Sequence, residues 1–415
     1  MSSQYMETKC CEICGDTNLK TVLNLGSHPL CDDLVRLGEQ RVCKEHPIEI
    51  LFCTRCYTAY QKYQVPKKEL FPKTYHYRSR FTADVLSGMS NLVNDCDHQV
   101  DGGVKGKKVL DIGCNDGSLL NLFKVKGANT IGVEPTGACS DALSGGHILY
   151  NDFFDEGTAS RIKNENGAVD IITFTNVFAH IEDLNKLLDS LKIVMHSKTI
   201  LVIENHYLGS VLDNCQFDTF YHEHPRTYSL KSFCGIAENL NMTLFKANFP
   251  SRYGGNIRVY IGGDGRMSSR EKQDIKEIIS HEKRFYQSLL DMQEYIPVWQ
   301  THMKEKIQKL INEYGPLPAK AFPGRAAILV KLLDLDKNSI SVVHEKPGSM
   351  KIGHYLPGTN IPIRSDNELI NSPMPPIIVN LAWHISKEIH NYLDGCGFDG
   401  EIIDIYSPNI KPRNV

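Results

Sequence analysis

The chain has 415 residues, of which 41% are hydrophobic and 23% charged, as in a soluble globular protein of two or three domains. A net charge of −3 and the lack of a basic run exclude nucleic acid as the expected partner. No apolar stretch reaches the ~18–20 residues of a membrane span, and the N-terminus lacks a signal-peptide core. We therefore expect a cytoplasmic protein whose 13 cysteines are thiols or metal ligands rather than disulfides.

Two C-x-x-C pairs stand within residues 1–70, which we expect to form a zinc-binding module. A pair of such turns offers four thiolates in a closed tetrahedral site, the arrangement that structural Zn²⁺ prefers. Two unrelated buried pairs, or two redox pairs, are the alternatives. The expected metal ligands are Cys11, Cys14, Cys53 and Cys56.

Residues 107–120 read as a buried strand, a tight glycine turn and a helix that begins at Ser118. The pattern D-x-G-x-x-x-G differs from the G-x-G-x-x-G that cradles a pyrophosphate. It resembles the first motif of Rossmann-like methyltransferases that use S-adenosylmethionine (SAM). The residues expected to bind the cofactor here are Asp111, Gly113, Asn115 and Gly117.

Residues 101–210 continue with alternating strand and helix patterns, which predict a parallel sheet. Glu134 ends the second strand, where a carboxylate can accept hydrogen bonds from the ribose hydroxyls. Asp152 follows the third strand and is expected beside the adenine. Asn176 and His180 follow the fourth strand and are also expected to bind the cofactor, with a structural role at a helix start as the alternative for His180. A dinucleotide-dependent dehydrogenase and an α/β domain without a ligand are the alternatives.

Residues 217–230 concentrate titratable groups in a stretch rich in turn formers. Tyr221, His222, Glu223 and His224 are consecutive, and an imidazole has a pKa near neutrality, as a general base requires. A base that follows a cofactor loop suggests an enzyme. A buried structural role is the alternative for either histidine.

The remainder of the chain reads as a connector and a second α/β domain. Residues 71–265 are expected to form the SAM-binding domain, residues 266–310 a helical connector, and residues 311–415 a smaller open sheet. Arg258 follows a double-glycine turn, where it can contact phosphate or lie exposed on a hairpin.

These motifs together resemble the sugar C-methyltransferases that act on nucleotide-linked 4-keto deoxysugars, over nearly the whole chain. The segments that carry the resemblance are the two C-x-x-C pairs and residues 71–79, 111–117, 176–183, 203–207, 218–224, 253–258 and 355–363.

The resemblance implies an α/β fold in three parts: an N-terminal zinc-binding module, a central Rossmann-like SAM-binding domain and a smaller Rossmann-like C-terminal domain that helps to hold the substrate. It also implies that His224 is the base and that Tyr221 and Glu223 assist it. Tyr75 is expected to support catalysis as a donor to the developing oxyanion. The expected substrate-binding residues are Tyr77, Tyr207, Arg258 and Lys351.

The chain departs from this family at the start of its C-terminal domain. Family members carry a loop rich in glycine and alanine, whereas Pro318 and its neighbours precede Arg325 here. Because proline has no N–H to donate, this loop offers fewer donors to an anion than the loop of the family does, and the sequence does not identify the nucleotide.

The expected reaction is SAM-dependent methylation at C3 of a nucleotide sugar, after His224 removes the proton that the neighbouring keto group acidifies. An O- or N-methyltransferase that deprotonates a hydroxyl or an amine is one alternative. A zinc-containing scaffold with a degenerate SAM fold is another. We expect SAM and structural Zn²⁺ as cofactors, a nucleotide-sugar substrate, no membrane partner, and a monomer or weak oligomer.

Overall fold

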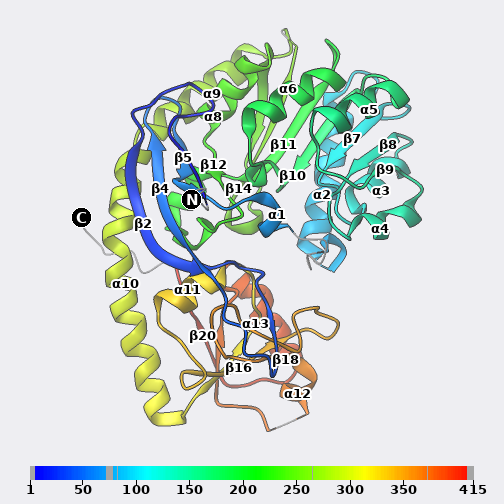
Figure 1. Cartoon of the computed structure of the whole chain (residues 1–415). Helices are drawn as coiled ribbons and strands as arrows, with labels where there is room; N and C mark the ends of the chain where they lie inside the picture. Colours follow the sequence, from blue (N-terminus) through cyan, green and yellow to red (C-terminus); the bar gives the residue numbers. More distant parts are fainter. Residues whose placement is uncertain (1–4, 72–77, 82, 264, 372, 409–415) are drawn as a thin grey trace. The chain divides into compact units, whose positions relative to one another are not determined.

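The computed structural model describes residues 5–71, 78–81, 83–263, 265–371 and 373–408 (Figure 1). Two compact units share the chain in alternating segments. Unit 1 contains Met1–Thr21, Leu51–Val211 and Glu223–Tyr286, and unit 2 contains Val22–Ile50, Leu212–His222 and Gln287–Val415. None of the helices in these described ranges is both long and apolar enough to cross a bilayer.

A seven-stranded sheet forms the centre of unit 1. Its order is β13-β14-β11-β10-β7-β8-β9, and β14 lies antiparallel between β11 and β13. The other neighbouring pairs are parallel, so their carboxyl ends share one edge of the sheet. The strands are β7 (Lys108–Ile112), β8 (Asn129–Val133), β9 (Ile148–Tyr150), β10 (Ile171–Thr175), β11 (Ile200–His206), β13 (Thr243–Asn248) and β14 (Asn256–Gly262).

Both faces of this sheet are buried, which explains the nearly continuous apolar runs of its strands. Alternate residues belong to different cores: Val109 and Ile171 pack with helices on one face, and Leu110 and Ile172 pack with helices on the other. Helices α2 (Ala83–Gln99) and α3 (Ser118–Val125) contribute to the first core. The second core includes residues of α5 (Glu156–Asn166), α6 (Leu184–Val194) and α8 (Leu230–Asn239).

Further strands and helices of unit 1 lie outside its seven-stranded sheet, and two of the strands continue into unit 2. Strand β12 (Arg226–Thr227) pairs antiparallel with β5 (Thr58–Gln61), and β1 (Met6–Glu7) pairs with β6 (Tyr63–Gln64). Strands β2 (Lys20–Pro29) and β4 (Glu45–Cys53) run from one unit into the other. The short helices are α1 (Lys67–Leu70), α4 (Cys139–Ala142) and α7 (Leu208–Asp213). Helix α9 (Ser269–Glu282) belongs to unit 1, whereas α10 (Phe285–Tyr314) belongs to unit 2 from Gln287 onward.

Unit 2 contains a smaller sheet of five parallel strands in the order β18-β16-β15-β19-β20. The strands of this five-stranded sheet are β15 (Leu317–Lys320), β16 (Ile340–Glu345), β18 (Ile363–Ser365), β19 (Ile377–Asn380) and β20 (Glu401–Asp404). Strands β3 (Val35–Arg36) and β17 (His354–Tyr355) form a separate two-stranded pair. The helices of unit 2 include α11 (Ala326–Leu332), α12 (Asp366–Ile370) and α13 (Ser386–Gly395).

The expected α/β class is confirmed, but the proline-rich segment differs from the expected loop. Residues Leu317–Lys320 form β15, which lies between β16 and β19. A central strand disfavours proline because proline cannot donate a ladder hydrogen bond. The register between β15 and β16 shifts between Leu317 and Pro318, so the proline stands at an irregularity of the ladder.

Candidate active site and metal centre

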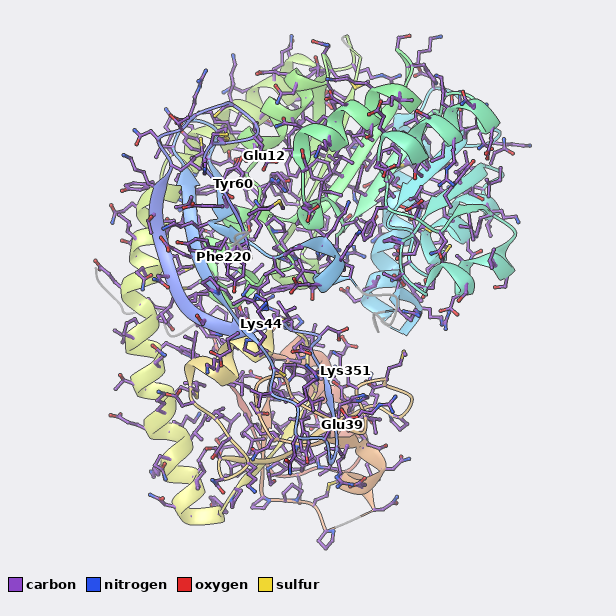
Figure 2. The ribbon with its side chains drawn as sticks, viewed as in Figure 1. Glu12, Glu39, Lys44, Tyr60, Phe220 and Lys351 are labelled. Atoms are coloured by element: carbon purple, nitrogen blue, oxygen red, sulfur yellow. The ribbon has the colours of Figure 1, made fainter. Side chains whose placement is uncertain are left out.

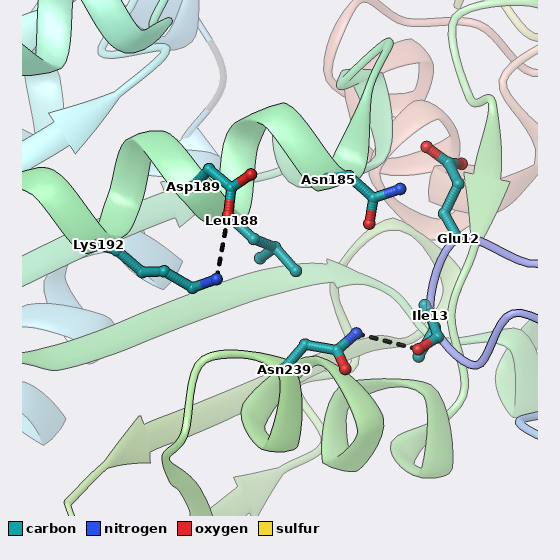
Figure 3. Close-up of a pocket in the computed structure, with 7 residues that line it drawn as sticks. All are labelled: Glu12, Ile13, Asn185, Leu188, Asp189, Lys192 and Asn239. Carbon is teal, nitrogen blue, oxygen red and sulfur yellow. Dashed lines mark hydrogen bonds and ion pairs between the residues drawn. The ribbon is translucent and has the colours of Figure 1, made fainter.

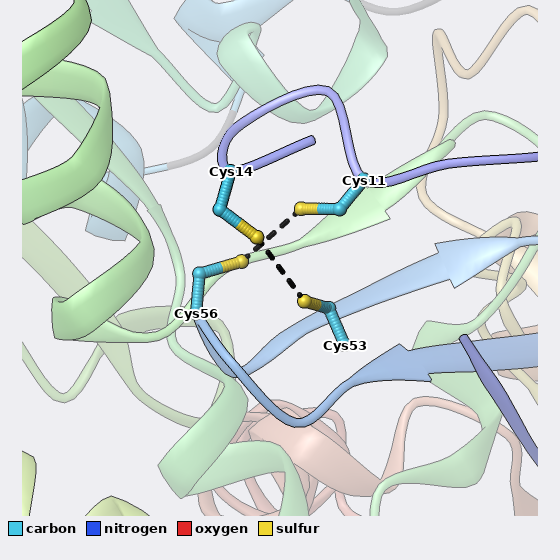
Figure 4. A group of neighbouring side chains, drawn as sticks. All are labelled: Cys11, Cys14, Cys53 and Cys56. Atoms are coloured by element: carbon cyan, nitrogen blue, oxygen red, sulfur yellow. Dashed lines mark hydrogen bonds between the residues drawn. The ribbon is translucent and has the colours of Figure 1, made fainter. Parts of the chain in front are cut away.

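Four cysteine sulfurs converge in the N-terminal part of unit 1 (Figure 4). The Sγ atoms of Cys11 and Cys56 are 3.2 Å apart, and those of Cys14 and Cys53 are 3.5 Å apart. All four lie within 4.8 Å of one another, and in the described ranges they are the one group of this kind. Two tight turns place them, since the Gly15 N–H donates to the Cys11 carbonyl and the Tyr57 N–H to the Cys53 carbonyl.

This donor set fits Zn²⁺. Tetrahedral Zn–S bonds of ~2.3 Å separate the sulfurs by roughly 3.8 Å, so a small expansion of the cluster accommodates the ion. Thiol hydrogen bonds from Cys53 and Cys56 lower the pKa of Cys11, and the same bonds to Cys11 raise the pKa of Cys53 and Cys56, so the thiolate of the cluster resides on Cys11. The hydroxyl of Tyr60, labelled in Figure 2, lies 3.0 Å from the Cys11 sulfur and supports it from outside the cluster. The four expected ligands are therefore brought together.

The glycine loop lies where the strand order reverses, between β7 and β10, and such switch points form ligand crevices at the carboxyl ends of strands. Gly113 has a φ of +73°, and a Cβ there would meet Val177 Cγ2 at 2.6 Å. Only glycine fits this approach. Gly117 has a φ of +78° and begins α3 at the expected residue, Ser118.

Glu134 is buried directly after β8 and holds the glycine loop. Its Oε2 accepts a hydrogen bond from the Asn115 N–H at 3.0 Å, and its Oε1 accepts one from the Thr136 N–H at 2.9 Å. Each oxygen keeps a second lone pair, which can accept from a ribose hydroxyl. Asp152, in contrast, is about half exposed after β9 and pairs with Arg161 at 3.4 Å.

Asp111 lies in the interior of β7 and is buried. Its Oδ1 accepts a hydrogen bond from the Thr173 hydroxyl at 2.7 Å, across the pairing of β7 with β10. Burial raises the pKa of Asp111 to about 7, and the negative charge of Glu134 adds to this effect. The carboxyl group thus supports the strand beneath the loop.

Three imidazoles converge at the same edge of the sheet. His180 follows β10, His206 ends β11, and His224 precedes β12. The ring centroids of His180 and His224 are 5.0 Å apart, and those of His206 and His224 are 5.1 Å apart. His224 is 4% exposed, so its ring is enclosed rather than solvated. A base in this cluster stands beside the strand ends that carry the expected cofactor residues.

Burial keeps His180 neutral. It lowers the pKa of His180 to about 4, and backbone hydrogen bonds to Glu223 and Asn176 oppose the shift only in part. The ring of Phe71 packs edge-on against it, with centroids 5.2 Å apart. Asn176 directly follows β10 and has a φ of +54°, which turns the chain away from the strand. The Asn176 N–H donates to the carbonyl of Glu204 at 2.7 Å.

The two histidines of residues 222–224 have different surroundings. His222 belongs to unit 2, where its Nε2 lies 3.0 Å from the carbonyl oxygen of His46. Burial lowers the pKa of His222 to about 3. Tyr221 also belongs to unit 2, whereas Glu223 and His224 belong to unit 1. Tyr75 and Tyr77 lie outside the described residues.

Arg258 is buried in an ionic network rather than at an open turn. Its Nε donates to Glu204 Oε2 at 2.6 Å, its Nη1 to Asp95 at 2.6 Å and its Nη2 to the Gly88 carbonyl at 3.3 Å. Arg252 donates to the other oxygen of Glu204 at 2.5 Å. The expected phosphate contact of Arg258 therefore has no support in this geometry.

The other two expected substrate residues have intramolecular partners. The Tyr207 hydroxyl donates to Glu282 at 3.0 Å, and Glu282 also accepts hydrogen bonds from the first two backbone N–H groups of α8. Lys351, in unit 2, donates to the Phe322 carbonyl at 2.6 Å. A substrate would have to replace or share these bonds.

A shallow polar hollow lies near the first cysteine pair and contains none of the expected catalytic side chains (Figure 3). Asp189 and Lys192 form an exposed ion pair there at 3.0 Å. Its lining consists of Glu12, Ile13, Asn185, Leu188, Asp189, Lys192 and Asn239.

The structure thus gathers the glycine-loop residues, Glu134, Asn176, His180 and His224 at one edge of the sheet of unit 1. His206 was not among the expected site residues. The signal that could have found it is its position, because it is the last residue of an apolar strand in a parallel sheet.

Comparison with known proteins accounts for most of the chain. A methyltransferase domain matches residues 77–247, a domain described as "Putative zinc binding domain" matches residues 11–71, and a C-methyltransferase C-terminal domain matches residues 251–402. The chain is 24% identical to the C-methyltransferase NovU of Streptomyces niveus over 91% of this chain and 90% of NovU.

Solved structures resemble part of the chain. Magnesium protoporphyrin IX methyltransferase from Synechocystis, solved with bound SAM, is 13% identical over 43% of this chain and 79% of its own, with a TM-score of 0.33. The PH0226 protein from Pyrococcus horikoshii is 14% identical over 48% of this chain and 98% of its own, with a TM-score of 0.34.

Proposed function

Because this chain is a SAM-dependent methyltransferase that carries a zinc-binding and a C-methyltransferase C-terminal domain, we propose that it methylates carbon. The proposed substrate is a nucleotide-linked 4-keto deoxysugar, and the proposed acceptor is C3. The observation that carries the proposal is the enclosed imidazole of His224 between two others, at the ends of strands β10 and β11.

A carbon acceptor needs a base of this kind. Carbon is a poor nucleophile until the proton beside a carbonyl is removed, and the resulting enolate then has a nucleophilic carbon. When bound, SAM supplies an electrophilic methyl group on its sulfonium. His224 removes the C3 proton and holds it on its ring, a step that typically contributes about 10²–10⁴ in rate.

The neighbouring histidine is suited to this role of His224. An imidazolium 5.0 Å away would oppose protonation of His224, but burial lowers the pKa of His180 to about 4. His180 is therefore neutral near pH 7 and places no positive charge beside His224. In our proposal, Tyr221 and Tyr75 donate hydrogen bonds to the enolate oxygen, and Glu223 assists the base or binds a sugar hydroxyl.

Cofactor binding is assigned to the glycine loop and Glu134. The main chain at Gly113 and Asn115 lies at the switch point of the sheet, and Glu134 has lone pairs left for the ribose hydroxyls. Asp152 follows β9 and Asn176 follows β10, at the same edge of the sheet. We therefore place the adenosyl moiety along the carboxyl ends of β7 to β10.

The product identifies the acceptor atom. A thermal-shift panel of thymidine, guanosine, cytidine and uridine diphosphosugars, with S-adenosylhomocysteine (SAH) present, selects the substrate. Reaction of that substrate with ¹³C-methyl SAM then places the methyl group by ¹³C NMR. We expect a carbon-bound methyl signal beside the keto carbon. A methoxy or N-methyl signal would instead establish O- or N-methylation and overturn the proposal.

A further inference from the structure

The first cysteine turn carries a carboxylate that reaches two distant parts of unit 1. Glu12 stands between Cys11 and Cys14, and its Oε1 accepts a hydrogen bond at 3.0 Å from the N–H of Leu184, the first residue of α6. Its Oε2 accepts one at 2.6 Å from Nε of Arg226. One side chain of the metal-binding turn therefore holds both a helix start and an arginine.

Arg226 uses all three guanidinium nitrogens. Besides the bond from Nε to Glu12, its Nη1 donates to the carbonyl of Ile181, and its Nη2 donates to the carbonyl of Glu182 at 3.0 Å. These two carbonyls directly follow His180 in the chain. The guanidinium thus fixes the segment that positions His180.

The backbone of Arg226 is joined to His224 through a single residue, Pro225. Arg226 is two residues after His224, and as the first residue of β12 it pairs with Tyr60 of β5. The hydroxyl of Tyr60 contacts the Cys11 sulfur at 3.0 Å. The metal-binding turn is therefore linked to Arg226 twice, through the carboxylate of Glu12 and through β5.

Burial makes this link rigid. The side chain of Arg226 is 0% exposed and that of Glu12 is 18% exposed. A buried guanidinium without its carboxylate would be an uncompensated charge, so the pair favours one geometry strongly. A planar guanidinium fork also defines orientation better than a lysine ammonium.

We propose that Arg226 is a positioning residue that uses the metal-binding turn, through Glu12, as a fixed support for His180 and His224. The zinc-binding module then contributes to the active site without supplying a catalytic group. The role of His224 as base rests on the proposed function, but the positioning of the two rings does not.

The test compares Arg226→Lys and Glu12→Gln with a control, Arg55→Lys. Arg55 lies in the second cysteine turn and donates to the Cys14 carbonyl at 3.4 Å, but it is exposed. Each variant is labelled with ¹⁵N-histidine, and the imidazole signals of His180 and His224 are assigned from single His→Asn replacements. Zinc content, SAH affinity and kcat are measured on the same samples.

For Arg226→Lys we expect one zinc per chain, unchanged SAH affinity, displaced signals of both histidines, and an unmoved signal of the exposed His98. Turnover should fall by about 10²-fold, as misplacement of a reacting group by about 1 Å does. Glu12→Gln, which keeps an acceptor for Leu184, should shift the same signals less. Arg55→Lys should change none of these quantities.

Unmoved signals of His180 and His224 in Arg226→Lys would overturn the proposal, whatever happens to turnover. Loss of zinc with a general collapse of the spectrum would also overturn it, because the pair would then serve only the fold of the module. If Arg226→Lys is insoluble, the same measurements are made on Glu12→Gln. Unmoved signals of His180 and His224, or loss of zinc with a general collapse of the spectrum, then overturn the proposal. Because the NMR signals need no substrate, this result is independent of whether the enzyme methylates carbon.

Discussion

The imidazole rings of His180 and His224 lie with their centroids 5.0 Å apart, tilted by 60°, although one follows β10 and the other precedes β12. A third ring, that of His206, packs against His224 from the end of β11. This arrangement encloses the proposed base between two other imidazoles, at the edge of the sheet where the expected cofactor residues lie.

Removal of the Glu134 charge should weaken the cofactor. Glu134→Gln keeps one acceptor and the shape of the side chain but loses the negative charge of the carboxylate, which accepts from the Asn115 and Thr136 N–H groups and, in our proposal, from the ribose hydroxyls. Hydrogen bonds to a charged group contribute ~1.5–3 kcal/mol, so the Kd for SAH should rise by about 10- to 100-fold. Calorimetry measures this, with the exposed Asp189→Asn as the control; equal affinities would refute the role of Glu134.

The metal centre should hold one zinc through four cysteines. Because a structural zinc contributes about 10 kcal/mol or more to folding, Cys53→Ser should lose zinc and destabilise unit 1 severely. The matched control is Cys10→Ser, since Cys10 is exposed and next to Cys11 but outside the cluster. Elemental analysis with circular dichroism checks both variants. A fully zinc-loaded Cys53→Ser would contradict the assignment.

Acid should destabilise unit 1 partly through His180. Its pKa is about 4 in the folded protein against 6.5 as the ordinary value, so between these pH values the unfolded chain binds more protons. The free energy of unfolding should therefore be intact above pH 6.5 and fall by up to ~1.4 kcal/mol per pH unit as the pH approaches 4.

Denaturant unfolding at pH 7.5, 6.0 and 5.0 tests this prediction. His180→Asn lacks the titrating ring and should show a shallower loss between pH 6.0 and 5.0 than the native chain. The exposed His98→Asn serves as the control and should retain the native slope. Parallel stability curves for His180→Asn and the native chain would show that His180 does not titrate as stated.

In unit 2, Arg325 should matter for stability. It binds Asp218 through two nitrogens at 2.6 and 2.9 Å, and Trp383 donates to the same carboxylate at 2.9 Å. Arg325→Met leaves Asp218 buried and uncompensated, which costs about 3–5 kcal/mol. Lys331→Met removes an exposed pair with Glu45 and should cost less than about 1 kcal/mol. Urea unfolding measures the free energy of unfolding of both variants. Similar losses of stability in Arg325→Met and Lys331→Met would argue against a structural role of Arg325.

The local features of the fold were predictable from the sequence. An apolar run followed by glycines and Ser118 predicted β7 and the start of α3, because strand and helix patterns and glycine turns act over a few residues. The spacing of the cysteines predicted a four-thiol cluster, and the structure brings these four sulfurs together. Glu134 and Asn176 were expected after strands, and the structure places them there.

The contacts between distant segments were not predictable in the same way. Nothing local indicates that Glu12 meets Arg226, or that Arg258 faces Glu204 and Asp95 rather than solvent, because these pairs form only when the sheet is assembled. Pro318 disfavours a central strand by propensity, yet the neighbouring strands and a register shift override it. His206 ends β11, and its contact with His224 likewise forms only when the sheet is assembled.

The most direct test of carbon methylation is deuterium exchange at C3 of the keto sugar in D₂O, with SAH in place of SAM so that no methyl group is transferred. We expect exchange by the native enzyme and a loss of about 10²–10⁴-fold in His224→Asn, which should still bind SAH normally. A native enzyme that methylates its substrate without exchanging this proton would contradict enolate formation, and a native exchange rate in His224→Asn would contradict the role of His224 as base.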